Sequence, residues 1–362
     1  MKRPVRRSRR SRSKRAFLAR IALGLVAALL VTLGFSACDD GSGGGAGDAG
    51  TTGYLPPAPC STASPEGLAG CLETSRYHAD LVTVAVPRPA DSPGATGVRD
   101  LCASRLASLG YQVELHAYAT GTNVLGWKMG ATHPSEIVIL SAHYDSVPNC
   151  PGADDDGSGV AGVLEAARAL AMGSFDRTLL VACWDEEELG LLGSKAFADR
   201  AATQALDIRG MISAEMIGYA DHTPNSQRLP AGFEVLFPDP SFTLAENEYR
   251  GDFITVVASS NAADLATALE TAGGAMRLPT IRLDVPDGLL NSDVVADLRR
   301  SDHAPFWAHG YPAIMLTDSA NFRNVAYHCQ QGQDTVDRLD DAFTLAVLRA
   351  TVQAVATTLD VP

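Results

Sequence analysis

Residues 136–159 read EIVILSAHYDSVPNCPGADDDGSG and place an apolar run directly before a polar turn. The run over residues 136–142 is short and rich in β-branched side chains, which predicts a buried strand of a parallel sheet. His143 and Asp145 follow at its carboxyl end, where open α/β sheets bind their ligands. This stretch therefore predicts both a type of fold and the position of a functional site.

Three consecutive aspartates, Asp154 to Asp156, lie near the end of the same stretch, before Gly157, Ser158 and Gly159. Residues 160–172 then alternate as an amphipathic helix does. Adjacent carboxylates repel one another and resist burial, so we expect either that all three are solvated or that a cation holds at least one. The turn by itself leaves both interpretations open, because acidic turns are common.

The composition is that of a folded chain, with 46% of the 362 residues hydrophobic and 20% charged. The charge is unevenly distributed, because residues 1–37 hold ten of the 29 Lys and Arg and no Asp or Glu. The remainder carries 19 basic and 42 acidic residues, a net charge of −23. A body this acidic is repelled by phosphate backbones, which argues against nucleic acid as a partner.

The basic start of the chain is typical of an export signal. Residues 2–20 are positively charged, and residues 21–37 form an uncharged apolar run of 17 residues. Small residues before Cys38 resemble a bacterial lipoprotein cleavage site, although Phe35 stands where a branched aliphatic residue is usual. Lipidation of Cys38 would tether the protein to a membrane of the cell envelope. A plain secretory signal cut near Ala37, giving a secreted protein, and an uncleaved signal anchor both remain open.

The composition divides the chain into three parts. Residues 1–38 form the signal or lipoprotein-type segment, and residues 39–58 form a flexible tether rich in Gly and Ser. Residues 59–362 hold the apolar periodicity and form the folded domain.

Removal of Cys38 leaves six cysteines, an even number in a chain predicted to leave the cytosol. Cys60 with Cys71 would close a short loop, and Cys150 with Cys329 a long one, but spacing alone does not determine the pairing. Free buried thiols are the alternative, and we favour a free thiol for Cys183 because it lies inside an apolar strand.

Apolar strand-like runs alternate with helical segments through the rest of the domain, and charged residues stand at the strand ends. Residues 59–110 are predicted to be mainly helical, and two alternating runs, 111–118 and 123–129, predict neighbouring strands. Three further runs predict buried strands: residues 178–184, 208–216 and 312–317. This order predicts an α/β fold with helices on both faces of the sheet. Residues 219–250 have little periodicity and are predicted to form a long loop.

The polar residues that end or follow these strands form a set able to bind metal. They are His143, Asp145, Asp155, Glu187, Glu188, Glu215 and His328. Two histidines with several carboxylates suit zinc, manganese or cobalt, and the set lacks the thiolates of a structural zinc site.

Six ordered motifs resemble those of the M28 co-catalytic zinc peptidases of the bacterial leucyl aminopeptidase type. They are His143 to Asp145, Gly152 to Gly159, EELGLLGS over residues 187–194, AEMIG over 214–218, SDHAPF over 301–306, and Tyr327 with His328. The resemblance covers the chain from about residue 95 onward. It implies a mixed, largely parallel central sheet with helices on both faces.

The resemblance also implies two Zn²⁺ ions per chain. His143 and Glu215 would hold one, Glu188 and His328 would hold the other, and Asp155 would bridge them. Glu215 departs from the family pattern, which usually has Asp at this position. The additional methylene extends the reach of the carboxylate by roughly 1.5 Å.

Three further residues receive catalytic roles from the same resemblance. Asp145 would orient the imidazole of His143, and Glu187 would be the general base for a metal-bound water. Tyr327 would donate a hydrogen bond to the oxyanion. Asp154 and Asp156 are then expected to shape the turn rather than bind metal.

These roles predict an exported zinc-dependent exopeptidase that releases N-terminal residues of peptides by attack of a metal-bound hydroxide. A glutamate-type carboxypeptidase is an alternative that needs a basic pocket, for which candidates are Arg228, Arg250, Arg282 and Arg323. A glutaminyl cyclase on the same fold would use a single zinc ion. A non-catalytic surface lipoprotein that retains the fold is the alternative from a different class.

Overall fold

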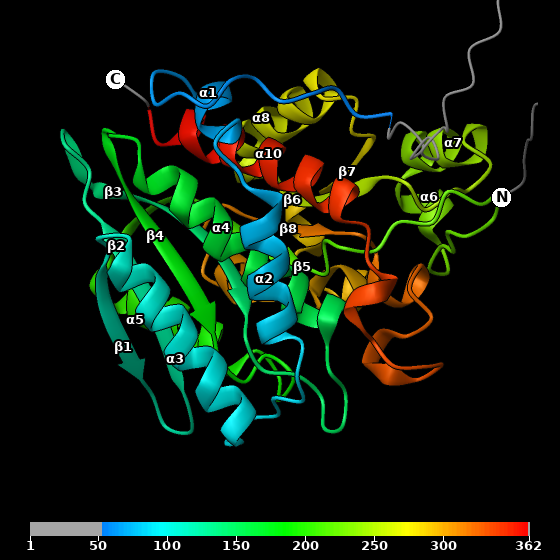
Figure 1. Ribbon diagram of the computed structural model, residues 1–362. Helices are drawn as coiled ribbons and strands as arrows, with labels where there is room; N and C mark the ends of the chain where they lie inside the picture. Colours follow the sequence, from blue (N-terminus) through cyan, green and yellow to red (C-terminus); the bar gives the residue numbers. More distant parts are fainter. Residues whose placement is uncertain (1–52, 361–362) are drawn as a thin grey trace, which may run out of the picture. The chain divides into compact units, whose positions relative to one another are not determined.

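The computed structural model describes residues 53–360 (Figure 1). The predicted signal segment, with Cys38, and most of the predicted tether lie outside the described residues. Within residues 53–360, no helix combines the length and the apolar character required to cross a bilayer.

One mixed sheet of eight strands organises the described residues, in the order β1-β2-β4-β3-β5-β8-β6-β7. The strands are β1 (Gln112–Ala117), β2 (Thr122–Lys128), β3 (His133–His143), β4 (Arg177–Trp184), β5 (Asp207–Glu215), β6 (Ile254–Ser259), β7 (Thr280–Val285) and β8 (Ala313–Thr317). The central strands β4, β3, β5 and β8 pair in parallel, as do β6 and β7. The remaining pairings are antiparallel. The predicted mixed, largely parallel sheet is confirmed.

Helices cover both faces of this sheet. One face packs against α1 (Pro65–Ala69), α2 (Thr74–Val84), α3 (Pro93–Ser108), α4 (Gly159–Ala171), α8 (Ala263–Ala275) and α10 (Asp341–Thr358). The other packs against α5 (Leu192–Gln204), α6 (Phe233–Leu236), α7 (Pro238–Glu246) and α9 (His303–Ala308). In Figure 1, α2, α4 and α10 lie in front of the strands.

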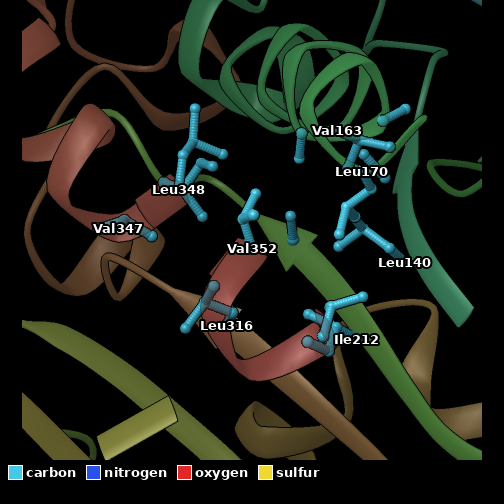
Figure 2. Close-up of a cluster of buried hydrophobic side chains, with 14 of the residues drawn as sticks. Leu140, Val163, Leu170, Ile212, Leu316, Val347, Leu348 and Val352 are labelled. Atoms are coloured by element: carbon cyan, nitrogen blue, oxygen red, sulfur yellow. The ribbon is translucent and has the colours of Figure 1, made fainter. Parts of the chain in front are cut away.

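Apolar side chains of the central strands meet α4 and α10 in the larger core. Figure 2 shows Leu140 of β3, Ile212 of β5 and Leu316 of β8 facing side chains of α4 and α10 such as Val163 and Leu348. All are at most 2% exposed. Burial on both faces explains why β3 and β5 are continuous apolar runs. The packing fixes the carboxyl ends of these strands in space.

Several elements differ from the sequence expectation or were not predicted. The strand β7 and the helices α8 and α10 were not assigned from the sequence. The predicted loop over residues 219–250 contains two short helices, α6 and α7. Both proposed disulfides are confirmed, Cys60–Cys71 and Cys150–Cys329, and Cys183 is a free buried thiol.

Candidate metal centre

The site lies where β3, β4 and β5 end. The parallel register brings the carboxyl ends of these three strands to the same edge of the sheet. His143 is the last residue of β3, Glu215 is the last residue of β5, and Glu187 and Glu188 follow β4. The fold thereby places residues far apart in sequence around one point.

The first group of ligating atoms consists of His143, Asp155 and Glu215, here called the strand-held cluster. His143 Nε2 lies 3.3 Å from Asp155 Oδ1 and 3.7 Å from Glu215 Oε2. The three residues are buried, and two of them end central strands. Glu215 therefore reaches the cluster with its longer side chain from the end of β5.

The second group consists of Asp155, Glu188 and His328, here called the loop-held cluster. His328 Nε2 lies 3.3 Å from Asp155 Oδ2 and 3.2 Å from Glu188 Oε2. Glu188 and His328 come from connecting segments rather than strands. Asp155 belongs to both clusters and presents one carboxylate oxygen to each.

The atoms that face each other in these clusters suit bound cations. Three buried side-chain atoms of the clusters have no hydrogen-bond partner within the described residues: His143 Nε2, Glu188 Oε1 and Glu215 Oε2. Leaving such atoms unpaired is costly unless an ion satisfies them. Imidazole nitrogens with carboxylate oxygens are a donor set that zinc prefers. The residues therefore fit two divalent cations that share Asp155.

The titration of the acidic groups supports the same interpretation. Burial, together with the nearby charge of Asp155, raises the pKa of Glu215 to about 8 against the lowering effect of His143. Burial and the charge of Asp155 also raise the pKa of Glu188. Burial disfavours the charged form of Asp155 too, but the imidazoles of His143 and His328, each 3.3 Å from one of its oxygens, hold its pKa below the ordinary value. Bound cations would oppose the raised values, because they favour ionised carboxylates.

Asp145 connects the two clusters, as its predicted orienting role requires. Asp145 Oδ1 lies 3.3 Å from His143 Nδ1, which leaves Nε2 of the ring facing the strand-held cluster. The same carboxylate accepts hydrogen bonds from the backbone N–H groups of Glu187 at 3.0 Å and Glu188 at 3.1 Å. One buried side chain therefore fixes both a ligand ring and the loop that carries Glu188.

Of the two alternatives left open for the three adjacent aspartates, the one in which all three are solvated is wrong. Asp154 and Asp156 are fully buried and Asp155 is 4% exposed. Asp156 accepts hydrogen bonds from the backbone N–H groups of His143 and Met216, and Asp154 accepts one from that of Gly218. Backbone donors from β3 and from the segment after β5 thus offset the desolvation of these carboxylates. Asp154 and Asp156 shape the turn, as predicted, and only Asp155 joins the clusters.

Glu187 lies beside the clusters without belonging to either. Its backbone is fixed by Asp145, and its side chain is half-buried. Burial raises the pKa of Glu187 well above its ordinary value. The charge of Glu215 raises this pKa as well, whereas the charge of His143 lowers it. A carboxylate with a raised pKa next to a cation site is able to accept and return a proton.

Tyr327 has a cationic partner that the sequence analysis did not identify. Its ring stacks on His328 with a centroid separation of 3.8 Å. Arg300 Nη2 donates a hydrogen bond of 2.7 Å to Tyr327 Oη, which leaves the phenolic O–H free to donate elsewhere. Arg300 directly precedes the SDHAPF motif. This position next to a motif is the sequence feature that could have indicated a role for Arg300 in the site.

Arg88 is a second residue that the sequence analysis missed. The fully buried guanidinium donates hydrogen bonds to the carbonyl oxygens of Tyr144, Pro151, Gly152 and Asp155. It fills the space behind the turn that presents Asp155. These four partners lie more than fifty residues along the chain, so local sequence gives no indication of this role.

An apolar pocket adjoins the centre, and Glu215 and Tyr327 form part of its wall. Aromatic and aliphatic side chains line its interior, among them Phe233, Phe253, Ile281, Leu283 and Met315. Arg228 and Arg300 also line the pocket. Residues 219–250, predicted to form a long loop, contribute Phe233 and Arg228.

Asp302 and His303 of the SDHAPF motif, and three of the arginines considered for a basic pocket, belong to neither cluster. His303 Nε2 lies 2.9 Å from the Leu298 carbonyl oxygen, and Asp302 is buried at the start of α9 without capping that helix. Of the arginines considered for a basic pocket, Arg250 and Arg282 form ion pairs with nearby carboxylates. Arg323 donates to Gln227 and to the Tyr219 carbonyl.

The sequence profile of peptidase family M28 matches residues 123–244. The chain is 34% identical over 216 residues to protein YfbL of Escherichia coli (strain K12), an alignment covering 56% of this chain and 61% of that protein. It is 30% identical over 220 residues to leucine aminopeptidase 1 of Ajellomyces dermatitidis (strain ER-3 / ATCC MYA-2586), covering 57% of this chain and 48% of that protein. The chain therefore spans less than two thirds of the length of these relatives.

The fold is also found among solved structures. The aminopeptidase from Aneurinibacillus sp. strain AM-1 superposes with a TM-score of 0.61 at 16% identity, covering 83% of this chain and 98% of that one. At this identity the similarity shows the fold alone. Over residues 123–244 the chain thus matches the model of peptidase family M28, and its fold is that of a solved aminopeptidase.

Proposed function

We propose that the protein is an exported aminopeptidase that uses two zinc ions to remove residues with apolar side chains from the N-termini of peptides. The observation that carries this proposal is the position of Asp155, which presents one oxygen to each of two ligand clusters. The match of residues 123–244 to the model of peptidase family M28 and the similarity to leucine aminopeptidase 1 support the same class of reaction.

His143, Asp155 and Glu215 would hold one ion, and Asp155, Glu188 and His328 the other. Bound there, the pair would supply Lewis acidity to the scissile carbonyl and lower the pKa of a water molecule. Glu187 accepts the proton of the attacking water and returns it to the leaving amine. Tyr327 donates its O–H to the carbonyl oxygen as negative charge develops there.

The pocket next to Glu215 determines the side-chain preference in this proposal. Its interior is lined by large apolar residues, so burying a leucine-sized side chain there is favourable by about 1.5 to 3 kcal/mol. Peptides that begin with leucine, methionine or phenylalanine are therefore the expected substrates.

Export is a further part of the proposal. The basic and apolar start of the sequence supports it, and so do the disulfides Cys60–Cys71 and Cys150–Cys329, because disulfides persist in oxidising compartments. Attachment to a membrane through Cys38 is proposed on the sequence alone.

The experiment that tests the function replaces Glu187 by Gln. Removal of the general base is expected to lower kcat on leucine p-nitroanilide by about 100- to 10,000-fold, while zinc content stays at two ions per chain. Glu186→Gln is the matched control, because Glu186 is buried beside Thr120 and lies outside both clusters. Turnover of Glu187→Gln close to that of the wild type would refute the proposed mechanism.

A carboxypeptidase is the second candidate, and one observation favours it: Arg228 and Arg300 both line the pocket. Guanidinium groups recognise a terminal carboxylate. Comparing hydrolysis of N-acetylated and free dipeptides distinguishes the two, because blocking the amino terminus abolishes only aminopeptidase activity.

A further inference from the structure

His328 lacks the support that the ligands of the strand-held cluster receive. His143 and Glu215 end strands whose backbones are fixed by parallel pairing. His328 lies in the short turn Tyr327–Cys329, with φ of 52° at His328 and 56° at Cys329. Non-glycine residues adopt this left-handed backbone only where the surroundings impose it. Some other contact must therefore hold His328 beside Asp155.

A disulfide supplies the first of these contacts. Cys329, the residue after His328, is bonded to Cys150, 179 residues earlier in the chain. Cys150 is 1% exposed and lies in the segment that leads to Asp155. Arg88 fixes the same segment by donating to the carbonyl oxygens of Pro151 and Gly152. The bond thus joins the turn of His328 to a rigid support next to Asp155.

Asp334 supplies the second contact between the same two segments. Its carboxylate accepts hydrogen bonds from the backbone N–H groups of Asp154 and Asp155, with Oδ2 at 3.0 Å from each nitrogen. Its own backbone N–H points to Cys329 Sγ at 3.4 Å, and its carbonyl oxygen accepts from the N–H of Ala153 at 3.2 Å. Hydrogen bonds therefore connect the turn of Asp155 through Asp334 to Cys329. The disulfide connects Cys329 back to Cys150, in the segment that leads to Asp155.

We propose that Cys150, Cys329 and Asp334 are positioning residues that hold His328 at the distance from Asp155 and Glu188 needed to bind a cation. This clamp affects the affinity of the loop-held cluster more than that of the strand-held cluster, because His143 and Glu215 are held by paired strands and only Asp155 is shared. The inference rests on the two-cation centre of the proposed function.

A purely stabilising disulfide would behave differently. Removing such a disulfide would lower the free energy of unfolding. It would not weaken the binding of one cation more than the other in the folded protein. The second disulfide of the chain, Cys60–Cys71, offers a matched control, because it closes a short loop beside α1 and contacts neither cluster.

The test is a calorimetric titration of metal-free protein with Zn²⁺, with circular dichroism to confirm folding. Wild type and Cys60→Ser/Cys71→Ser are expected to bind two equivalents each, and each equivalent is expected to bind with the same affinity in both proteins. Cys150→Ser/Cys329→Ser is expected to bind the first equivalent as wild type does and the second at least about tenfold more weakly. Asp334→Ala, which retains the disulfide, is expected to show the same selective loss and decides the matter if the double variant does not fold.

The outcomes separate this inference from the proposed function. Wild-type protein that binds fewer than two equivalents would refute the two-cation centre itself. Two equivalents in wild type, with unchanged or equally weakened binding of both in the folded clamp variants, would overturn the clamp alone. A selective loss in the Cys60→Ser/Cys71→Ser control would also overturn it.

Discussion

The two clusters use the same kinds of ligand but are supported in different ways. In the strand-held cluster, the side chains of His143 and Glu215 are 1% and 8% exposed and extend from the ends of paired strands. In the loop-held cluster, the side chain of His328 is 28% exposed and is held by a disulfide and by Asp334. The sheet therefore preorganises one half of the centre, whereas cross-links between loops build the other half.

Asp155 is the only residue that the two clusters share, so its loss is expected to be the most damaging change. Asp155→Ala should reduce kcat/KM on leucine p-nitroanilide by more than about 1,000-fold, because neither cation keeps its full ligand set. Zinc content measured by mass spectrometry should fall below one ion per chain. The exposed Asp100→Ala is the control and should behave as wild type. Retention of two ions by Asp155→Ala would show that the clusters are independent.

Removing one histidine from each cluster compares the two supports directly. His328→Ala should leave one tightly bound zinc ion per chain, because the strand-held cluster keeps all its ligands. His143→Ala should weaken binding in the strand-held cluster, which is expected to be the tighter of the two. Equilibrium dialysis against a zinc chelator measures both affinities. Loss of both ions from His328→Ala would contradict the difference in support.

Asp145 acts on both clusters, so its removal should affect them together. Asp145→Ala frees the ring of His143 and the backbone of Glu187 and Glu188. We expect zinc affinity to fall about 10- to 100-fold, as is typical when the partner of a metal-bound histidine is lost. The same dialysis measures the change. A fall confined to one ion would show that Asp145 supports only one side.

Shortening one carboxylate in each cluster should give the smallest effects. Glu215→Asp removes a methylene from a residue whose backbone is fixed between β3 and β8, so we expect about a tenfold loss of affinity. Glu188 lies in the connecting segment after β4, and this segment can adjust. We therefore expect Glu188→Asp to lower zinc affinity by less than about threefold. A larger loss in Glu188→Asp than in Glu215→Asp would reverse the proposed order of rigidity.

The sequence predicted the parts of the site that depend on local pattern. Strand ends, a histidine two residues before an aspartate, and the ordered motifs located His143, Asp155, Glu188, Glu215 and His328, and the fold brings all five together. The α/β class followed from the order of strand-like and helical segments, and the family resemblance implied a mixed, largely parallel sheet. Spacing only offered the pairings Cys60–Cys71 and Cys150–Cys329 as candidates, and the structure contains both.

The parts that sequence did not predict depend on contacts between distant segments. Burial of Asp154 and Asp156 is possible because backbone donors arrive from β3 and from the segment after β5. The contact of Arg300 with Tyr327 spans 27 residues, and that of Arg88 with Asp155 spans 67. No periodicity or motif encodes such partners, because the tertiary fold alone brings them together.

The most direct measurement is the anomalous scattering of zinc in crystals of the loaded protein, recorded at the zinc absorption edge. Two peaks are predicted, one within coordination distance of His143 and Glu215 and one within that of Glu188 and His328, with Asp155 contacting both. A single peak, or peaks coordinated by other residues, would contradict the shared two-cation centre.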